Sequence, residues 1–242
     1  MAVNENPDII ISDVMMPVYD GFQFTKYLKS KMETSHIPII LLTAKAQSHD
    51  KIVGYQQGAD DYVAKPFDEE ELKLKVHNIL LTRKRYREKF KKNFIINPSM
   101  VEAHSLDEKF LLKVTNVVEA NISNSSFTVE ELCDDLSMSR RSLYGKLKAL
   151  TDMNPSQFIR TIRLKRAAQL LSQNSGSISE IAFKTGLENT SYFTKCFKET
   201  FNKLPSEYSE QKNSLLPPIR CMNLPIAIII VINLAFTLLN IK

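Results

Sequence analysis

The 242-residue chain has few of the features that mark secreted, metal-binding or membrane-spanning proteins. Its three cysteines, Cys133, Cys196 and Cys221, are an odd number without CxxC or Cys/His spacing. They predict neither a disulfide framework nor a zinc site. The first residues are polar and lack a basic segment followed by an apolar run, so no secretory signal peptide is expected. Together these absences favour a reducing, cytoplasmic location.

The overall composition is that of an ordinary folded protein. Hydrophobic residues make up 43% and charged residues 24% of the chain, which excludes wholesale disorder and a multi-span membrane protein. The length allows one large or two small domains. Charge is uneven: residues 1–70 carry 6 Lys and Arg against 11 Asp and Glu, whereas the remainder carries 26 against 16. This split predicts two modules with different partners, the second partner being a polyanion.

The front part alternates between strand-like and helix-like segments. Residues 8–13 and 37–43 are short apolar runs, Tyr62 and Val63 form a third, and helical spacing lies between them. This alternation predicts an α/β fold with a doubly wound parallel sheet. In such sheets the functional site lies at the carboxyl ends of the strands, where Asp13, Thr43 and Lys65 stand. A carboxylate can accept a phosphoryl group, while a hydroxyl and an ammonium can bind its oxygens.

The residues that flank Asp13, Thr43 and Lys65 in the sequence support a phosphoryl-accepting site. Asp13-Val14-Met15-Met16-Pro17, Asp20-Gly21, Thr43-Ala44 and Lys65-Pro66-Phe67 together resemble the response-regulator receiver family over about residues 7–87. The resemblance implies that Asp13 is the phosphoacceptor, that Thr43, Tyr62 and Lys65 form the switch, and that the Lys65–Pro66 bond is cis.

One departure from the receiver pattern is large. Only twelve residues precede Asp13, so the family's first strand, first helix and second strand are missing, together with the acidic pair that holds Mg²⁺. A complete receiver is expected to bind Mg²⁺, whereas this chain is predicted to have no metal site and no cofactor as it stands. We therefore expect a truncated receiver that is impaired in phosphotransfer, with an incomplete sheet whose first strand is an exposed edge.

The middle of the chain predicts a helix from about Asp68 to Arg87, acidic at its start and basic at its end, followed by a connector. The predicted domains are a truncated receiver at 1–87, a linker at 88–107, an all-helical domain at 108–212 and an apolar tail at 213–242.

The back part contains the pattern of two helix-turn-helix units. Thr128 and Glu131 form a capping box before one short helix, and Ser139 caps a second helix from Arg140. A similar layout recurs around residues 178–201, and the amphipathic segment 155–173 joins the two units. Two units on a rigid connection could place helices in successive major grooves of DNA, roughly 34 Å apart.

Residues across about 108–210 resemble the AraC-type DNA-binding domain, notably Ile178 to Ala182, Thr185-Gly186, Ser191 to Phe193, Cys196 to Lys198, and Pro205 to Tyr208. The pattern departs at Leu187, Gly145, Asp152 and Asn202, the last two of which replace glycines. The resemblance implies base contacts from Arg141, Tyr144, Thr190, Ser191, Tyr192 and Lys195. Phosphate contacts are expected from Arg140, Lys146, Lys148 and Lys184.

Both resemblances in this order predict the C-terminal fragment of a hybrid two-component regulator, a phosphorelay transcription factor and not an enzyme. The expected partners are double-stranded DNA with a repeated operator and the histidine kinase module of a parent protein, with a homodimer as an open possibility. Residues 224–239 form an apolar stretch that could be a membrane anchor, an extra helix or out-of-frame sequence. The alternative function is therefore a membrane-tethered or dimerising interaction protein without regulated DNA binding.

Overall fold

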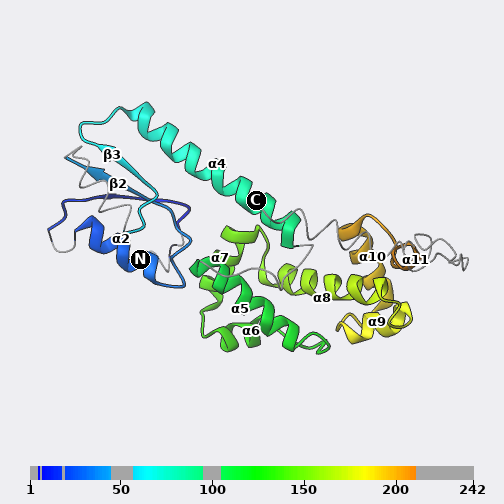
Figure 1. Cartoon of the computed structure of the whole chain (residues 1–242). Coiled ribbons are helices and arrows are strands. Elements are labelled where there is room, and N and C mark those ends of the chain that lie inside the picture. Colours follow the sequence, from blue (N-terminus) through cyan, green and yellow to red (C-terminus); the bar gives the residue numbers. More distant parts are fainter. Residues whose placement is uncertain (1–4, 6, 18–19, 45–56, 95–104, 211–242) are drawn as a thin grey trace, which may run out of the picture.

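The computed structural model describes residues 5, 7–17, 20–44, 57–94 and 105–210. Within these ranges the chain forms a small α/β part, a long connecting helix and an all-helical part (Figure 1). The predicted fold classes of both parts are confirmed. The apolar tail and Cys221 lie outside the described residues, and Cys133 and Cys196 are buried free thiols. No helix within the described ranges has both the length and the apolar character needed to cross a membrane.

The α/β part is a parallel sheet of three strands in the order β1-β2-β3: β1 (Ile10–Asp13), β2 (Ile39–Thr43) and β3 (Asp61–Ala64). Ser12 pairs with Leu41, and Leu41 in turn pairs with Tyr62. Strand β2 is central and almost wholly buried, which explains its continuous apolar sequence. Strand β1 has a neighbour on one side only among the described residues, so it is the exposed edge that the sequence predicts.

Helix α2 (Gly21–Ser30) begins where Asp20 accepts a hydrogen bond from the backbone N–H of Gln23, and it packs Leu28 against the sheet. Helix α4 (Glu69–Phe94) starts with three glutamates and runs from the sheet toward the helical part (Figure 1). It ends seven residues beyond the Arg87 at which the sequence placed its end. Strong helix formers among residues 88–92 continue the helix, although no apolar face marks them.

The helical part comprises α5 (Leu106–Ala120), α6 (Val129–Leu136), α7 (Arg140–Thr151), α8 (Pro155–Ser172), α9 (Ile178–Lys184), α10 (Thr190–Phe201) and α11 (Pro205–Glu210). Four of these helices, α5, α6, α8 and α9, begin with a complete capping box. Each capping box satisfies backbone donors that would otherwise lack partners, and the box of α6, Thr128 with Glu131, is the one that the sequence predicts.

Helix α8 belongs to two hydrophobic cores. Its first half places Phe158 and Ile162 among side chains of α5, α6 and α7, and its second half places Leu164 and Leu171 among those of α9 and α10. Both helix-turn-helix units are therefore built on one continuous helix (Figure 1). Burying large side chains at both ends of α8 fixes the relative orientation of the two units.

Candidate functional sites

The first site lies at the carboxyl end of β1. The Lys65 ammonium donates a hydrogen bond to Asp13 Oδ2, and the backbone N–H of Met15 donates to Oδ1 at 3.1 Å. The Lys65 interaction, followed by the Met15 one, lowers the pKa of Asp13 below its ordinary value. Asp13 is therefore held as a carboxylate, the form in which it can act as a nucleophile.

The remaining residues of the predicted switch lie on β2 and β3. Thr43 ends β2 and is buried, and its backbone carbonyl accepts a hydrogen bond of 2.7 Å from the N–H of Lys65. Tyr62 is buried in β3, and the Lys65–Pro66 peptide bond is cis, as the resemblance implies. The structure thus places Asp13, Thr43 and Lys65 at the carboxyl edge of the sheet, whereas Tyr62 pairs with Leu41 within it and packs in the core. The roles of the four residues stay predictions.

A magnesium ion does not fit the residues that surround Asp13. The Asp13 carboxylate is already engaged by Lys65 and Met15. Within the described ranges, no group of three or more His, Cys, Asp or Glu side chains could hold a metal ion. Since Mg²⁺ needs several oxygen ligands in octahedral geometry, the described residues at this edge offer too few.

The first helix-turn-helix unit consists of α6 and α7. Ser137, with φ of 54° in the left-handed region, makes the turn between them, and Ser139 caps α7. Arg140 pairs with Glu130 at 2.5 Å and lies over the ring of Tyr144, whereas Arg141 is exposed. The Arg141 side chain is thus accessible to a DNA base in this structure.

Two of the lysines predicted to contact phosphate are engaged within the protein. Lys148 is exposed and pairs with Asp152 at 2.8 Å. Lys146 is fully buried, and its ammonium pairs with Asp107 at 2.8 Å. Lys146 can reach a DNA phosphate only if the residues that cover it move away.

The second unit consists of α9 and α10. Gly186 has a φ of 68°, and a Cβ there would lie 2.7 Å from the Ile122 carbonyl oxygen, so the turn requires glycine. Asn189 caps α10 and leaves the predicted DNA-facing side of the helix in solvent. Its exposed residues are Thr190, Ser191, Tyr192 and Lys195. Lys184, at the end of α9, is exposed too and donates a hydrogen bond of 3.3 Å to the Ser175 carbonyl.

Two arginines on α8 that the sequence patterns did not single out hold parts of this unit in place. Arg160 donates a hydrogen bond of 3.0 Å to the Tyr192 hydroxyl and thereby orients that ring. Arg163 is buried and donates to the carbonyls of Gly186 and Asn124, which ties the turn of the second unit to the connection between α5 and α6. The helical periodicity does not distinguish these two arginines from other residues, because both occupy ordinary polar positions of an amphipathic helix.

Comparison with known protein families agrees with this geometry. Residues 1–77 match the response regulator receiver domain, and residues 132–211 match a helix-turn-helix domain. The chain therefore combines a response regulator receiver with an AraC-type helix-turn-helix DNA-binding domain. Domains of both kinds are regulatory and not enzymatic.

Individual relatives cover the two parts together or separately. The chain is 41% identical over 211 residues to histidine kinase P4 of Formosa agariphila, a match that covers 87% of this chain and 15% of that protein. Protein PilH of Pseudomonas aeruginosa is 48% identical over 81 residues, which are 34% of this chain and 66% of PilH. The chain thus spans a small part of the kinase and about two thirds of PilH.

Among solved structures, a DNA-binding transcriptional dual regulator from Escherichia coli K-12 is 29% identical, with a TM-score of 0.40. The match covers 43% of this chain and 91% of that one. A response regulator from Chloroflexus aurantiacus is 40% identical, with a TM-score of 0.32, and the match covers 33% of this chain and 66% of that one.

Proposed function

We propose that this chain is a sequence-specific transcription regulator of a two-component phosphorelay that binds double-stranded DNA through its two helix-turn-helix units. The observation that carries the proposal is the surface of α10, where four residues predicted to face bases are exposed. Helix α10 is capped by Asn189 and anchored in the core by Phe193 and Phe197. A rigid helix with a free polar face fits the major groove.

Substitution of Tyr192 tests most directly whether this surface of α10 contacts DNA bases. Tyr192 is 46% exposed and its hydroxyl accepts a hydrogen bond from Arg160, so the ring is oriented before DNA binds. We expect Tyr192→Ala to lower affinity for a duplex selected by the wild-type chain by about 1–3 kcal/mol. Affinity for random DNA should change little, because Tyr192 carries no charge and non-specific binding is electrostatic.

The experiment starts with selection of binding sites by the wild-type chain from a randomised duplex pool, followed by titration of the best sequence and a scrambled one. Tyr27→Ala is the matched control, since Tyr27 is an exposed tyrosine on α2 in the receiver part. Equal loss of affinity on selected and scrambled DNA would contradict base recognition by Tyr192. Failure of the wild-type chain to enrich any sequence would contradict the proposed function.

The phosphorelay part of the proposal rests on Asp13 and on the similarity to a histidine kinase across both domains. A histidine kinase module in a parent hybrid protein would be the phosphoryl donor, and the DNA target places the chain in the cytoplasm. An oxygen of the Asp13 carboxylate would attack the phosphorus of a phosphohistidine on that module, the P–N bond would break and the imidazole would leave. The Lys65 ammonium would move onto a phosphoryl oxygen to balance the charge that Asp13 gains.

Phosphotransfer to Asp13 should nevertheless be impaired in the 242-residue chain, because the described residues around Asp13 offer too few oxygen ligands for Mg²⁺. Incubation with acetyl phosphate and Mg²⁺, followed by intact mass measurement, tests this. We expect little addition of a phosphoryl group to the wild-type chain and none to Asp13→Asn. Stoichiometric addition that Asp13→Asn abolishes would refute the impairment.

A further inference from the structure

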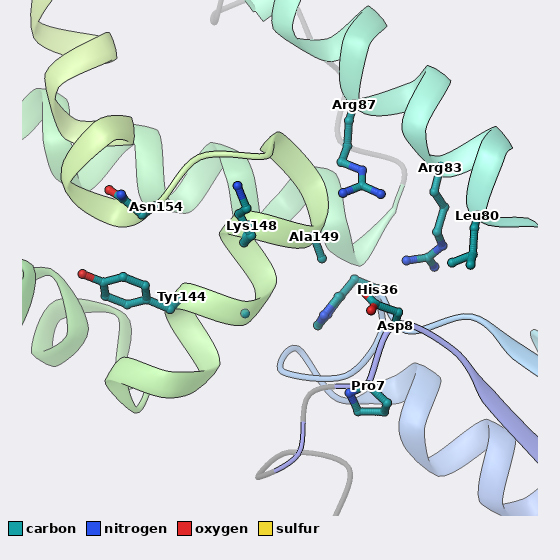
Figure 2. Close-up of a pocket in the computed structure, with 11 residues that line it drawn as sticks. Pro7, Asp8, His36, Leu80, Arg83, Arg87, Tyr144, Lys148, Ala149 and Asn154 are labelled. Carbon is teal, nitrogen blue, oxygen red and sulfur yellow. The ribbon is translucent and has the colours of Figure 1, made fainter.

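A cavity of about 310 Å³ lies where the receiver part, α4 and α7 meet (Figure 2). We propose that this cavity binds the phosphate group of a small anion, either inorganic phosphate or an organic phosphomonoester. Its lining includes neither Asp13 nor any residue of α10, so the inference goes beyond the proposed function. The volume is near the lower end of the roughly 300–1,000 Å³ that is typical of small-molecule sites.

Two guanidinium groups bring positive charge to the cavity. Arg83 and Arg87 stand one helical turn apart on α4, and Figure 2 shows both side chains extending toward His36, with α7 across the cavity. Arg87 Nε is buried and has no hydrogen-bond partner among the residues that the structure describes. Because each guanidinium presents its N–H donors in a planar fork, two of them together can bind several oxygens of one phosphate.

The carboxylates around Arg83 leave this positive charge largely uncompensated. Burial is the main cause that lowers the pKa of Arg83, and the neighbouring Arg87 lowers it further. Three carboxylates oppose this effect: Asp60, Asp107 and Asp8. The first two are each paired with a lysine, at 2.6 and 2.8 Å, and of the three only Asp8 lines the cavity, where it is exposed. A dianion between the two arginines therefore compensates charge that these carboxylates do not.

His36 forms the buried end of the site. It is only 2% exposed, and its Nδ1 has no hydrogen-bond partner within the described ranges. A buried polar atom without a partner destabilises the fold, and a ligand that accepts a hydrogen bond from Nδ1–H removes this penalty. A neutral imidazole carries one N–H, so His36 can donate to a phosphate oxygen without becoming charged.

The rest of the lining suits a small organic group attached to the phosphate. Apolar surface comes from all three segments and an aromatic ring from α7: the residues are Pro7, Leu80, Ala149 and Tyr144. Lys148 lies at the rim, where it is exposed and already forms an ion pair at 2.8 Å. Since the ligand contacts the receiver part, α4 and α7 together, its binding also stabilises the folded chain.

Isothermal titration calorimetry on the full chain tests the proposal. The two probes are inorganic phosphate and phenyl phosphate, and chloride at equal ionic strength controls for screening. Arg87→Gln removes one guanidinium from the cavity, and Arg83→Gln is a second variant that removes the other. Arg85→Gln is the matched control, because it makes the same change on α4 at an exposed side chain that does not line the cavity. Circular dichroism verifies that the variants fold.

NMR locates the bound anion. The imidazole signals of His36 should shift as either probe is added, whereas those of His77, which is exposed on α4, should stay in place. This comparison separates the cavity from the Asp13 site, where the Lys65 ammonium could also attract phosphate.

We expect saturable binding at one site per chain in the wild type and in Arg85→Gln. Arg87→Gln and Arg83→Gln should each bind at least about tenfold more weakly, since each loses charge-assisted hydrogen bonds to the phosphate. Tighter binding of phenyl phosphate than of inorganic phosphate would assign the cavity to phosphomonoesters. Equal affinities would assign it to inorganic phosphate, and both results support the site.

Absence of saturable binding of both probes would overturn the inference. Equal affinities of the wild type, Arg87→Gln and Arg83→Gln would also overturn it, as would binding that leaves the His36 signals unchanged. None of these measurements involves DNA, so their failure is distinct from failure of the proposed function.

Discussion

His36 should make the folded chain sensitive to acid. Its imidazole is buried between the receiver part and the helical part, and Nδ1 has no hydrogen-bond partner. Burial, followed by the nearby Lys146 ammonium, lowers the pKa of His36 from 6.5 to about 4. Asp107 on α5 opposes this effect, while Arg83 on α4 and Lys29 on α2 add to it.

The size of the effect follows from the difference between the two pKa values. As the pH falls, His36 in the unfolded chain binds a proton near pH 6.5, whereas in the folded chain it binds one only near pH 4. The free energy of unfolding therefore falls as the pH falls through this window, by at most about 1.4 kcal/mol per pH unit and about 3 kcal/mol in all. Above pH 6.5 the imidazole is neutral in both states and contributes no pH dependence.

Urea unfolding followed by circular dichroism between pH 7.5 and pH 4 measures this dependence. His36→Phe keeps an aromatic ring but removes the titration, so its unfolding free energy should fall less over the same range. His77→Phe is the control, since His77 is exposed on α4 and its replacement should leave the wild-type curve unchanged. Parallel curves for the wild type and His36→Phe would refute the burial argument, because shared losses from carboxylates cancel in this comparison.

Two further predictions concern the turn and the acceptor site. Ser137→Gly should raise the free energy of unfolding of the helical part by about 1 kcal/mol, because Ser137 has a φ of 54°, and Ser137→Val should lower it. Thermal unfolding of both variants checks this, and stabilisation by valine would contradict it. Lys65→Met should raise the pKa of Asp13 toward its ordinary value, since Lys65 is the main cause of its lowering. A carboxyl titration by NMR with unchanged pKa would show that the Lys65 interaction does not control Asp13.

Local signals explain why so much of the fold could be predicted. The capping box at Thr128 and the cap at Ser139 mark helix starts through hydrogen bonds to backbone N–H groups three residues away. The gathering of Asp13 and Lys65 follows equally from the rule that parallel strands share one carboxyl edge.

The burial of Lys146 could not be predicted from such local signals. Its position on α7 gives it the appearance of a solvent-facing lysine on a recognition helix, yet it is fully buried against Asp107 and Ser35. These partners come from segments 39 and 111 residues away, and helical periodicity carries no information on such contacts. The same holds for Arg160, whose partner Tyr192 lies on another helix.

The most direct test of the central claim is the ratio of affinities of the wild-type chain for its selected duplex and for a scrambled duplex of equal length, at one fixed salt concentration near 0.15 M. A sequence-specific regulator should bind the selected duplex more tightly by a factor on the order of 10³ or more. A ratio near one, with both affinities falling equally as salt rises, would contradict the account and leave only electrostatic attraction between a basic helical part and DNA.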